Sequence, residues 1–138
     1  MKFPPDIEVV GDTSFRGDCP AELAEQITTV QEIRRRWPDT LGRLVLHHRG
    51  EGKRDHRTFA KERAEGLCPG ASDIIIPGNP CIVLELKRRD NTKSRLPPAE
   101  LEFLRAAQAA GARVCIALGW QAAISFVERF HRSVGRTR

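Results

Sequence analysis

Two apolar segments near the middle of the chain carry ionisable residues that could do chemistry. The first begins at Asp73 and the second ends in Glu85-Leu86-Lys87, with Gly78-Asn79-Pro80 between them. Side chains alternate between the two faces of a strand, so Glu85 and Lys87 share one face. If the segments form a hairpin with this short loop, Asp73 lies opposite Glu85. The sequence therefore predicts two carboxylates and one ammonium on one face of a hairpin.

Two carboxylates this close repel each other unless a cation neutralises them. Mg²⁺, for which Mn²⁺ can substitute, takes oxygen ligands of this kind. A neighbouring lysine ammonium can orient an attacking water or stabilise charge on a phosphoryl group. Asp73, Glu85 and Lys87 therefore predict metal-dependent phosphodiester hydrolysis. The alternative is a surface ion pair between Glu85 and Lys87 on an edge strand, but the apolar run Ile82-Val83-Leu84 favours a central strand.

Positive charge brackets this acidic pair along the sequence. The 138 residues include 23 Lys and Arg against 18 Asp and Glu, a net charge of +5. Such an excess permits a polyanionic partner, and its placement on both sides of the pair favours phosphate contacts over simply solvated loops. Gln26 is open to two readings, a contact in the site or a helix contact, and His48 is expected to contact phosphate or water. The predicted DNA-binding residues are Gln26, His48, Arg49, Lys53, Arg54, Arg88, Arg89, Lys93 and Arg95.

Length and composition set the broad class of protein. The length is typical of one domain, and no apolar run is long enough to span a membrane or act as a signal peptide, so a cytoplasmic protein is expected. The four cysteines form no CxxC pair, so they are expected to be reduced thiols rather than zinc ligands. These cysteines are Cys19, Cys68, Cys81 and Cys115.

Hydrophobic periodicity predicts the elements that position these residues. Residues 1–19 show no sustained pattern and are expected to form an extended arm, with one short strand around 7–10. An apolar stripe predicts a helix from residue 20 to 37, on which Glu22 and Gln26 lie near the stripe and Glu25 is expected to point to solvent. Further helices are expected at 55–65, 97–108 and 121–131, and strands at 44–46, 73–76, 81–87 and 114–118. This order predicts an α/β (mixed α+β) domain with a central mixed four-stranded sheet flanked by helices. The stripe consists of Leu23, Ile27, Val30, Ile33 and Trp37.

Five short motifs occur in order and together point to a known family. With them, residues 20–131 resemble the virus-type replication-repair nuclease (VRR-NUC) family of the PD-(D/E)xK nuclease superfamily, especially its small single-domain phage members. The resemblance implies a restriction-endonuclease-like core in a nuclease domain at 20–138. It also implies a metal site formed by Glu22, Asp73 and Glu85, with Lys87 as their catalytic partner. The motifs are Glu22-x-x-x-Gln26, His47-His48-Arg49-Gly50-Glu51-Gly52-Lys53-Arg54, Glu65-Gly66-Leu67-Cys68-Pro69-Gly70-Ala71-Ser72-Asp73, Leu84-Glu85-Leu86-Lys87 and Gly111-Ala112-Arg113-Val114.

The chain also departs from the family pattern. Ser72 stands where the family often has Pro, and Arg49-Gly50-Glu51 where it often has Asn-Gly. Glu100 replaces the usual Gln at the start of the helix that follows Lys87. The last two changes affect accessory polar contacts but not the metal ligands. Glu22 has an alternative role as well, because a glutamate in the first turn complements the helix dipole.

These observations predict a divalent-metal-dependent endodeoxyribonuclease. The alternative is a catalytically inactive DNA-binding or assembly module on the same fold, suggested by Glu51 and Glu100. A small-molecule phosphatase or other metal hydrolase ranks last, because no Gly-rich phosphate loop is present. Without a base-reading motif, recognition is expected to rest on phosphates and DNA shape.

The resemblance further implies how such a nuclease would assemble and what it would cut. Small relatives of this kind suggest a homodimer that resolves Holliday (four-way) junctions in phage or mobile-element recombination or repair. A two-fold pair of sites suits symmetric nicking. The arm at 1–19, or the last helix near Phe126 and Phe130, is expected in the interface. If the chain is phage-encoded, it acts in the bacterial host cytoplasm.

Overall fold

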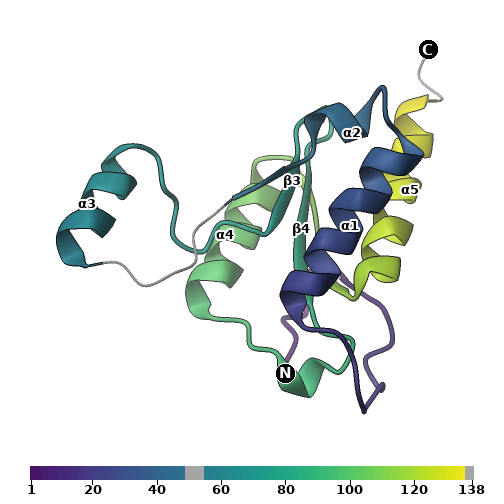
Figure 1. Ribbon diagram of the computed structural model, residues 1–138, viewed down its shortest axis with the longest axis horizontal. Helices are drawn as coiled ribbons and strands as arrows, with labels where there is room; N and C mark the ends of the chain where they lie inside the picture. Colours follow the sequence, from purple (N-terminus) through teal and green to yellow (C-terminus); the bar gives the residue numbers. More distant parts are fainter. Residues whose placement is uncertain (49–54, 136–138) are drawn as a thin grey trace.

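A five-stranded mixed sheet with helices on both faces forms the body of the protein (Figure 1). The computed structural model describes residues 1–48 and 55–135. The strands are β1 (Val9–Val10), β2 (Leu46–His47), β3 (Ile74–Ile76), β4 (Ile82–Lys87) and β5 (Arg113–Leu118), in the order β1-β5-β4-β3-β2. The helices are α1 (Glu22–Arg36), α2 (Leu41–Leu44), α3 (His56–Ala64), α4 (Pro98–Ala109) and α5 (Trp120–Gly135), with a 3₁₀ turn at Asn91–Lys93.

The α/β class is confirmed, but the sheet has one strand more than the four predicted. The additional strand is β1, which pairs in parallel with β5 through Val9 and Ile116. Ile7, just before it, is buried in the core on the side of α4. The segment at 1–19 is therefore joined to the sheet of its own chain, because β1 covers an edge that β5 would otherwise expose.

The central hairpin has the predicted register. Strands β3 and β4 are antiparallel, with Ile74 opposite Leu84 and Ile76 opposite Ile82. One further step along this register places Asp73 opposite Glu85. Strand β4 also pairs in parallel with β5 along its whole length, and all six of its residues are buried. It is thus a central strand, and the edge-strand alternative for Glu85 is excluded.

The sheet separates two layers of core. On one face, Leu84 and Leu86 pack with Ile33 of α1 and Phe126 of α5. On the other face, Val83 of β4 packs with residues of α4 such as Leu104. Because side chains alternate along β4, Glu85 and Lys87 belong to the same face as Val83. The hairpin therefore presents its charged residues on the face that α4 covers.

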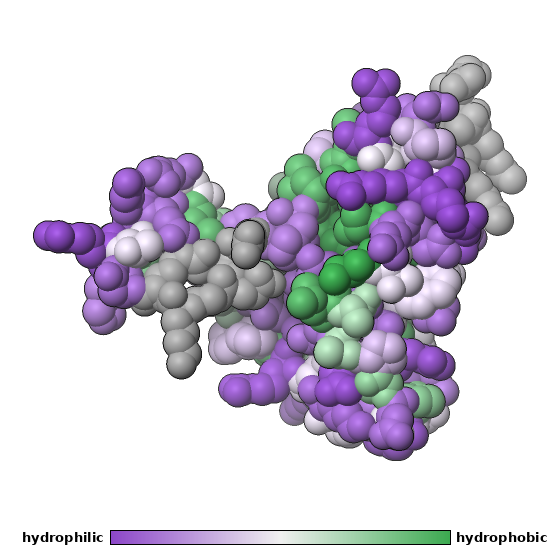
Figure 2. Space-filling model, in the orientation of Figure 1, coloured by the Kyte–Doolittle hydropathy of each residue, from purple (hydrophilic) through white to green (hydrophobic). Residues whose placement is uncertain are grey.

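Helix α1 forms as predicted but is rotated from the predicted orientation. Leu23 and Ile27 are 65% and 49% exposed, whereas Glu25 is only 2% exposed. The prediction that Glu25 points to solvent was wrong, because its Oε2 accepts a hydrogen bond of 2.8 Å from the backbone N–H of Trp120 at the start of α5. A carboxylate is favourable at a helix N-terminus, and this contact turns the first apolar residues outward. Figure 2 shows apolar surface on the side where α1 faces the viewer.

The segment between α1 and β2 also differs from the prediction. Leu44 was expected in a strand but ends the short helix α2, so β2 begins only at Leu46. The chain turns tightly here, since the N–H of Gly42 donates to the carbonyl of Trp37 over 2.7 Å. A Cβ at Gly42 would lie 2.7 Å from that oxygen, so the turn requires glycine.

The helix predicted at 55–65 is confirmed as α3 (His56–Ala64). The carboxylate of Asp55 caps it by accepting a hydrogen bond of 2.7 Å from the backbone N–H of Thr58. Gly66, with φ of +116°, follows its end. No residue of α3 is buried, and the helix stands apart from the sheet and the other helices (Figure 1). Across the described ranges, no helix combines the length and apolar character needed to cross a membrane.

Candidate active site

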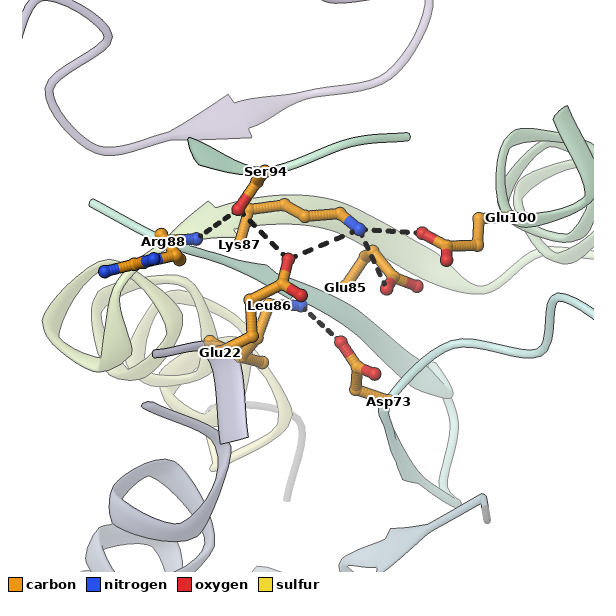
Figure 3. A network of polar contacts seen from close by, with 8 residues as sticks. All are labelled: Glu22, Asp73, Glu85, Leu86, Lys87, Arg88, Ser94 and Glu100. Atoms are coloured by element: carbon orange, nitrogen blue, oxygen red, sulfur yellow. Dashed lines mark hydrogen bonds and ion pairs between the residues drawn. The ribbon is translucent and has the colours of Figure 1, made fainter. Parts of the chain in front are cut away.

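The predicted catalytic residues come together where four elements meet (Figure 3). Asp73 directly precedes β3, Glu85 and Lys87 belong to β4, and Glu22 is the first residue of α1. The first turn of α4 adds Glu100. In the sequence, Glu100 was noted only as a departure from a family pattern. Its position just after Pro97-Pro98, in the first turn of a predicted helix, was the one feature that could have marked it as a residue of the site.

The ammonium of Lys87 lies among three carboxylates. Its Nζ is 2.7 Å from Glu100 Oε1, 3.6 Å from Glu22 Oε1 and 3.7 Å from Glu85 Oε1. Burial alone would lower the pKa of Lys87, but the hydrogen bond to Glu100 and the neighbouring carboxylates outweigh it, so the pKa is raised. Lys87 therefore remains a cation. The hydroxyl of Ser94 donates to Glu22 over 3.1 Å and fixes that carboxylate as well.

The two opposed carboxyls are buried and incompletely satisfied. Asp73 Oδ2 accepts a hydrogen bond of 2.9 Å from the backbone N–H of Leu86. Glu85 is 3% exposed, and among the described residues its Oε2 has no hydrogen-bond partner. Burial, and then the charge of Asp73, raise the pKa of Glu85 to about 10, and burial also raises the pKa of Asp73. Without a cation, this pair disfavours full ionisation.

These features fit a divalent cation. The unpaired oxygen of Glu85 and the carboxylate of Asp73 are hard oxygen donors, and Mg²⁺ commonly keeps several waters and takes one or two carboxylates. The described residues contain no cluster of three or more His, Cys, Asp or Glu side chains around one point. Glu22 instead contacts Lys87 and Ser94. Asp73 and Glu85 are thus the candidate ligands that the geometry supports, and the role of Glu22 as a third ligand stays a prediction.

The loop that carries Asp73 is held from two sides. Gly70 has φ of +79°, and a Cβ there would lie 2.4 Å from the carbonyl oxygen of Ala99 in α4. On the side of β2, Nε2 of His48 accepts from the N–H of Cys68 over 3.3 Å. Nδ1 of His47 lies 2.7 Å from the carbonyl oxygen of Asp73. The two histidines therefore position the loop, a role that sequence reasoning did not assign to them.

Three of the predicted DNA-binding residues contact the N-terminal segment of their own chain. The guanidinium of Arg88 donates to two backbone carbonyls, and Nζ of Lys93 donates to a third. The guanidinium of Arg89 lies 4.9 Å from the centre of the Phe15 ring. These basic side chains hold residues 15–20 against the end of β4, and their contacts with DNA stay predictions. The carbonyls belong to Pro20 and Cys19 for Arg88, at 3.1 and 2.8 Å, and to Gly17 for Lys93, at 2.9 Å.

The other predicted DNA contacts are placed differently. Gln26 is buried on α1, which suits an internal contact better than an exposed one. Arg95 is exposed on the loop between β4 and α4. Arg49, Lys53 and Arg54 lie outside the described residues.

Comparisons with known proteins address the fold. No family model matches the sequence, and no curated protein matches it. Among solved structures, a chain described as "VRR_NUC domain protein" matches with a TM-score of 0.67 at 20% sequence identity. The match covers 86% of this chain and 92% of that one. At this identity the likeness establishes a shared fold, which is the fold that the sequence motifs led us to expect.

Proposed function

We propose that this chain is a divalent-metal-dependent endodeoxyribonuclease. The observation that carries the proposal is the buried pair of Asp73 and Glu85 beside the ammonium of Lys87. Among the described residues, Oε2 of Glu85 has no hydrogen-bond partner other than this opposing carboxyl. A folded protein rarely buries an unpaired carboxylate unless a cation or a reaction uses it. The fold shared with a VRR_NUC domain protein supports a nuclease over other metal-dependent hydrolases.

Each residue of the site has its own role in the proposed phosphodiester hydrolysis. Asp73 and Glu85 would hold the cation, which when bound polarises a phosphoryl oxygen and makes water a better nucleophile. Lys87 donates hydrogen bonds toward the attacking water or the charge that develops on the phosphoryl oxygens. Glu22 and Glu100 keep that ammonium in place. The water oxygen bonds to phosphorus as the bond to the leaving oxygen breaks, and a phosphomonoester and a hydroxyl result.

The proposed substrate is DNA recognised through phosphates and shape, with branched DNA favoured. Exposed cations support phosphate contact: Arg95 lies on the loop from β4 to α4, and Arg57, Lys61 and Arg63 lie on α3. The surface is hollowed between α3 and the rest of the molecule (Figure 2). A projecting helix beside a concave surface can follow the backbone of a bent or branched duplex.

We propose a homodimer, which would present two sites to a four-way junction. Phe126 is buried within its own chain, and Phe130 packs against it with ring centres 4.8 Å apart. The exposed apolar residues of α1 and β2 are therefore better placed for an interface than these two phenylalanines. These exposed residues include Leu23, Ile27 and Leu46.

A panel of DNA substrates tests the proposal. Four-way junction, linear duplex and single-stranded DNA are incubated with the protein and Mg²⁺ or Mn²⁺, beside Asp73→Asn, Lys87→Ala and the control Glu102→Gln, whose side chain is exposed on α4. We expect metal-dependent cleavage by the native protein and the control only, fastest on the junction. DNA binding without any cleavage or metal binding would instead support the inactive module. Light scattering tests the dimer separately, and a strict monomer that cuts all duplexes equally would refute the junction proposal.

A further inference from the structure

The nearest partner of Lys87 is a carboxylate outside the proposed metal pair. Nζ of Lys87 lies 2.7 Å from Glu100 and 3.7 Å from Glu85, so only the first distance is that of a hydrogen bond. Figure 3 shows the ammonium reaching toward Glu100, with Glu85 beside it. The side chain of Lys87 is 4% exposed, so the ammonium has few partners other than these carboxylates.

The backbone that carries Glu100 is held in place. Glu100 lies in the first turn of α4, where the helix dipole favours a negative charge. The preceding residue, Ala99, is packed against Gly70, so the helix start and the loop that carries Asp73 form one unit. The start of α4 therefore fixes the position from which the Glu100 carboxylate reaches the ammonium of Lys87.

The pairing of Lys87 with Glu100 leaves Glu85 available to bind a cation. Its Oε2 has no hydrogen-bond donor among the described residues other than the opposing carboxyl, and its Oε1 lies 3.7 Å from the Lys87 ammonium, beyond hydrogen-bond distance. A lysine ammonium can donate a hydrogen bond to a carboxyl oxygen whether or not that carboxyl carries its proton, and a buried ammonium favours any acceptor within reach because it has little access to water. If Glu100 did not hold Lys87, the ammonium would be expected to close onto Glu85 and occupy the position that a cation needs.

We propose that Glu100 is a positioning residue that holds Lys87 away from Glu85 and so keeps Glu85 open to a divalent cation. This inference rests on the metal site of the proposed function. It gives a role to Glu100, one of the positions where this chain departs from the family pattern that it resembles. In this role the hydrogen-bond acceptor matters and the negative charge does not, because a glutamine oxygen could accept the same bond from Lys87.

The test compares Glu100→Ala with Glu100→Gln. Both remove one negative charge, and Glu102→Ala removes the same charge from an exposed position on the same helix. Mn²⁺ binding is measured by calorimetry, and the metal-free variants are solved as crystal structures. We expect Glu100→Ala to weaken Mn²⁺ binding about tenfold, which corresponds to ~1.4 kcal/mol, and to bring Lys87 to hydrogen-bond distance of Glu85. Glu100→Gln and Glu102→Ala should stay within about threefold of the native affinity.

Each other outcome has a defined meaning. Equal losses in Glu100→Ala and Glu100→Gln would overturn the inference, because the charge of Glu100 would then be what matters. Native Mn²⁺ affinity in Glu100→Ala, or an unmoved Lys87 in its crystal structure, would overturn it too. If the native protein binds no Mn²⁺, the metal site of the proposed function fails, and the movement of Lys87 in the metal-free crystals still decides the positioning role.

Discussion

Replacing Glu85 with glutamine should stabilise the protein in the absence of divalent ions. Burial raises the pKa of this carboxyl from its ordinary value of 4.5 to about 10. At pH 7 the folded protein therefore holds a proton that the unfolded chain releases. Taking up that proton opposes folding by about 1.4 kcal/mol for each pH unit by which the pH exceeds the ordinary pKa of the carboxyl. At pH 7 this amounts to about 3 kcal/mol. Glu85→Gln removes this penalty and keeps the shape of the side chain.

The sign of the pH dependence follows from the same shift. A carboxyl with a raised pKa in the folded state contributes full stability below pH 4.5, and loses it progressively as the pH rises toward about 10. The free energy of unfolding of the native protein should thus fall between pH 5 and 9 more steeply than that of the variant. The other ionisable groups are common to both proteins, so the difference between the two slopes reports on Glu85 together with the Asp73 carboxyl opposite it.

Urea unfolding in EDTA at several pH values measures both effects. If Asp73 and Glu85 hold the proposed cation, adding Mg²⁺ should then raise the stability of the native protein, because the ion would bind only the folded state. The variant, which lacks one of the proposed ligands, should respond much less, and the exposed Glu102→Gln control should behave like the native protein. A variant less stable than the native protein at pH 8 in EDTA, or equal slopes with pH, would refute this reasoning.

Three other substitutions test how the site is held. Gly70→Ala should destabilise the protein by about 2 kcal/mol or more, since a Cβ would clash with α4 and the backbone is left-handed; a melting temperature within 2 °C of native would contradict this. Arg88→Ala should increase hydrogen exchange in residues 15–20 while DNA affinity changes little; a large loss of affinity with unchanged exchange would instead make it a phosphate contact. Glu25→Ala should lower the free energy of unfolding by about 1–2 kcal/mol by leaving the Trp120 N–H unpaired, with Glu25→Gln closer to native; urea unfolding measures the difference, and equal losses would refute the hydrogen-bond argument.

The hairpin and its register could be predicted because their determinants are local. Period-two alternation placed Glu85 and Lys87 on one face, and the short loop then set Asp73 opposite Glu85. The bounds of α4 were similarly marked by Pro97-Pro98 and by Gly111, as the structure confirms. The side-chain pattern of a short segment was enough in each case.

Contacts between residues far apart in the chain determine the features that the sequence could not predict. Five apolar residues suggested a buried stripe on α1, yet a hydrogen bond between Glu25 and a residue 95 positions away sets the rotation of the helix. The partner of Glu100 could not be read from α4 alone, because Lys87 lies on another element. The partners of Arg88 could not be predicted either, because the sequence does not distinguish a basic residue that contacts backbone carbonyls from one that contacts phosphate.

The position of β5 in the chain affects when activity can arise during synthesis. The residues of the candidate site, from Glu22 to the positioning residue Glu100, all precede β5 in the chain, so each leaves the ribosome before β5 does. Strand β4 nevertheless pairs with β5 along its whole length, and Glu25 needs the backbone of Trp120. We therefore expect a nascent chain that ends before residue 113 to carry every acidic residue of the candidate site, without a formed site. The proposed activity would then arise only after synthesis has passed β5 and the start of α5.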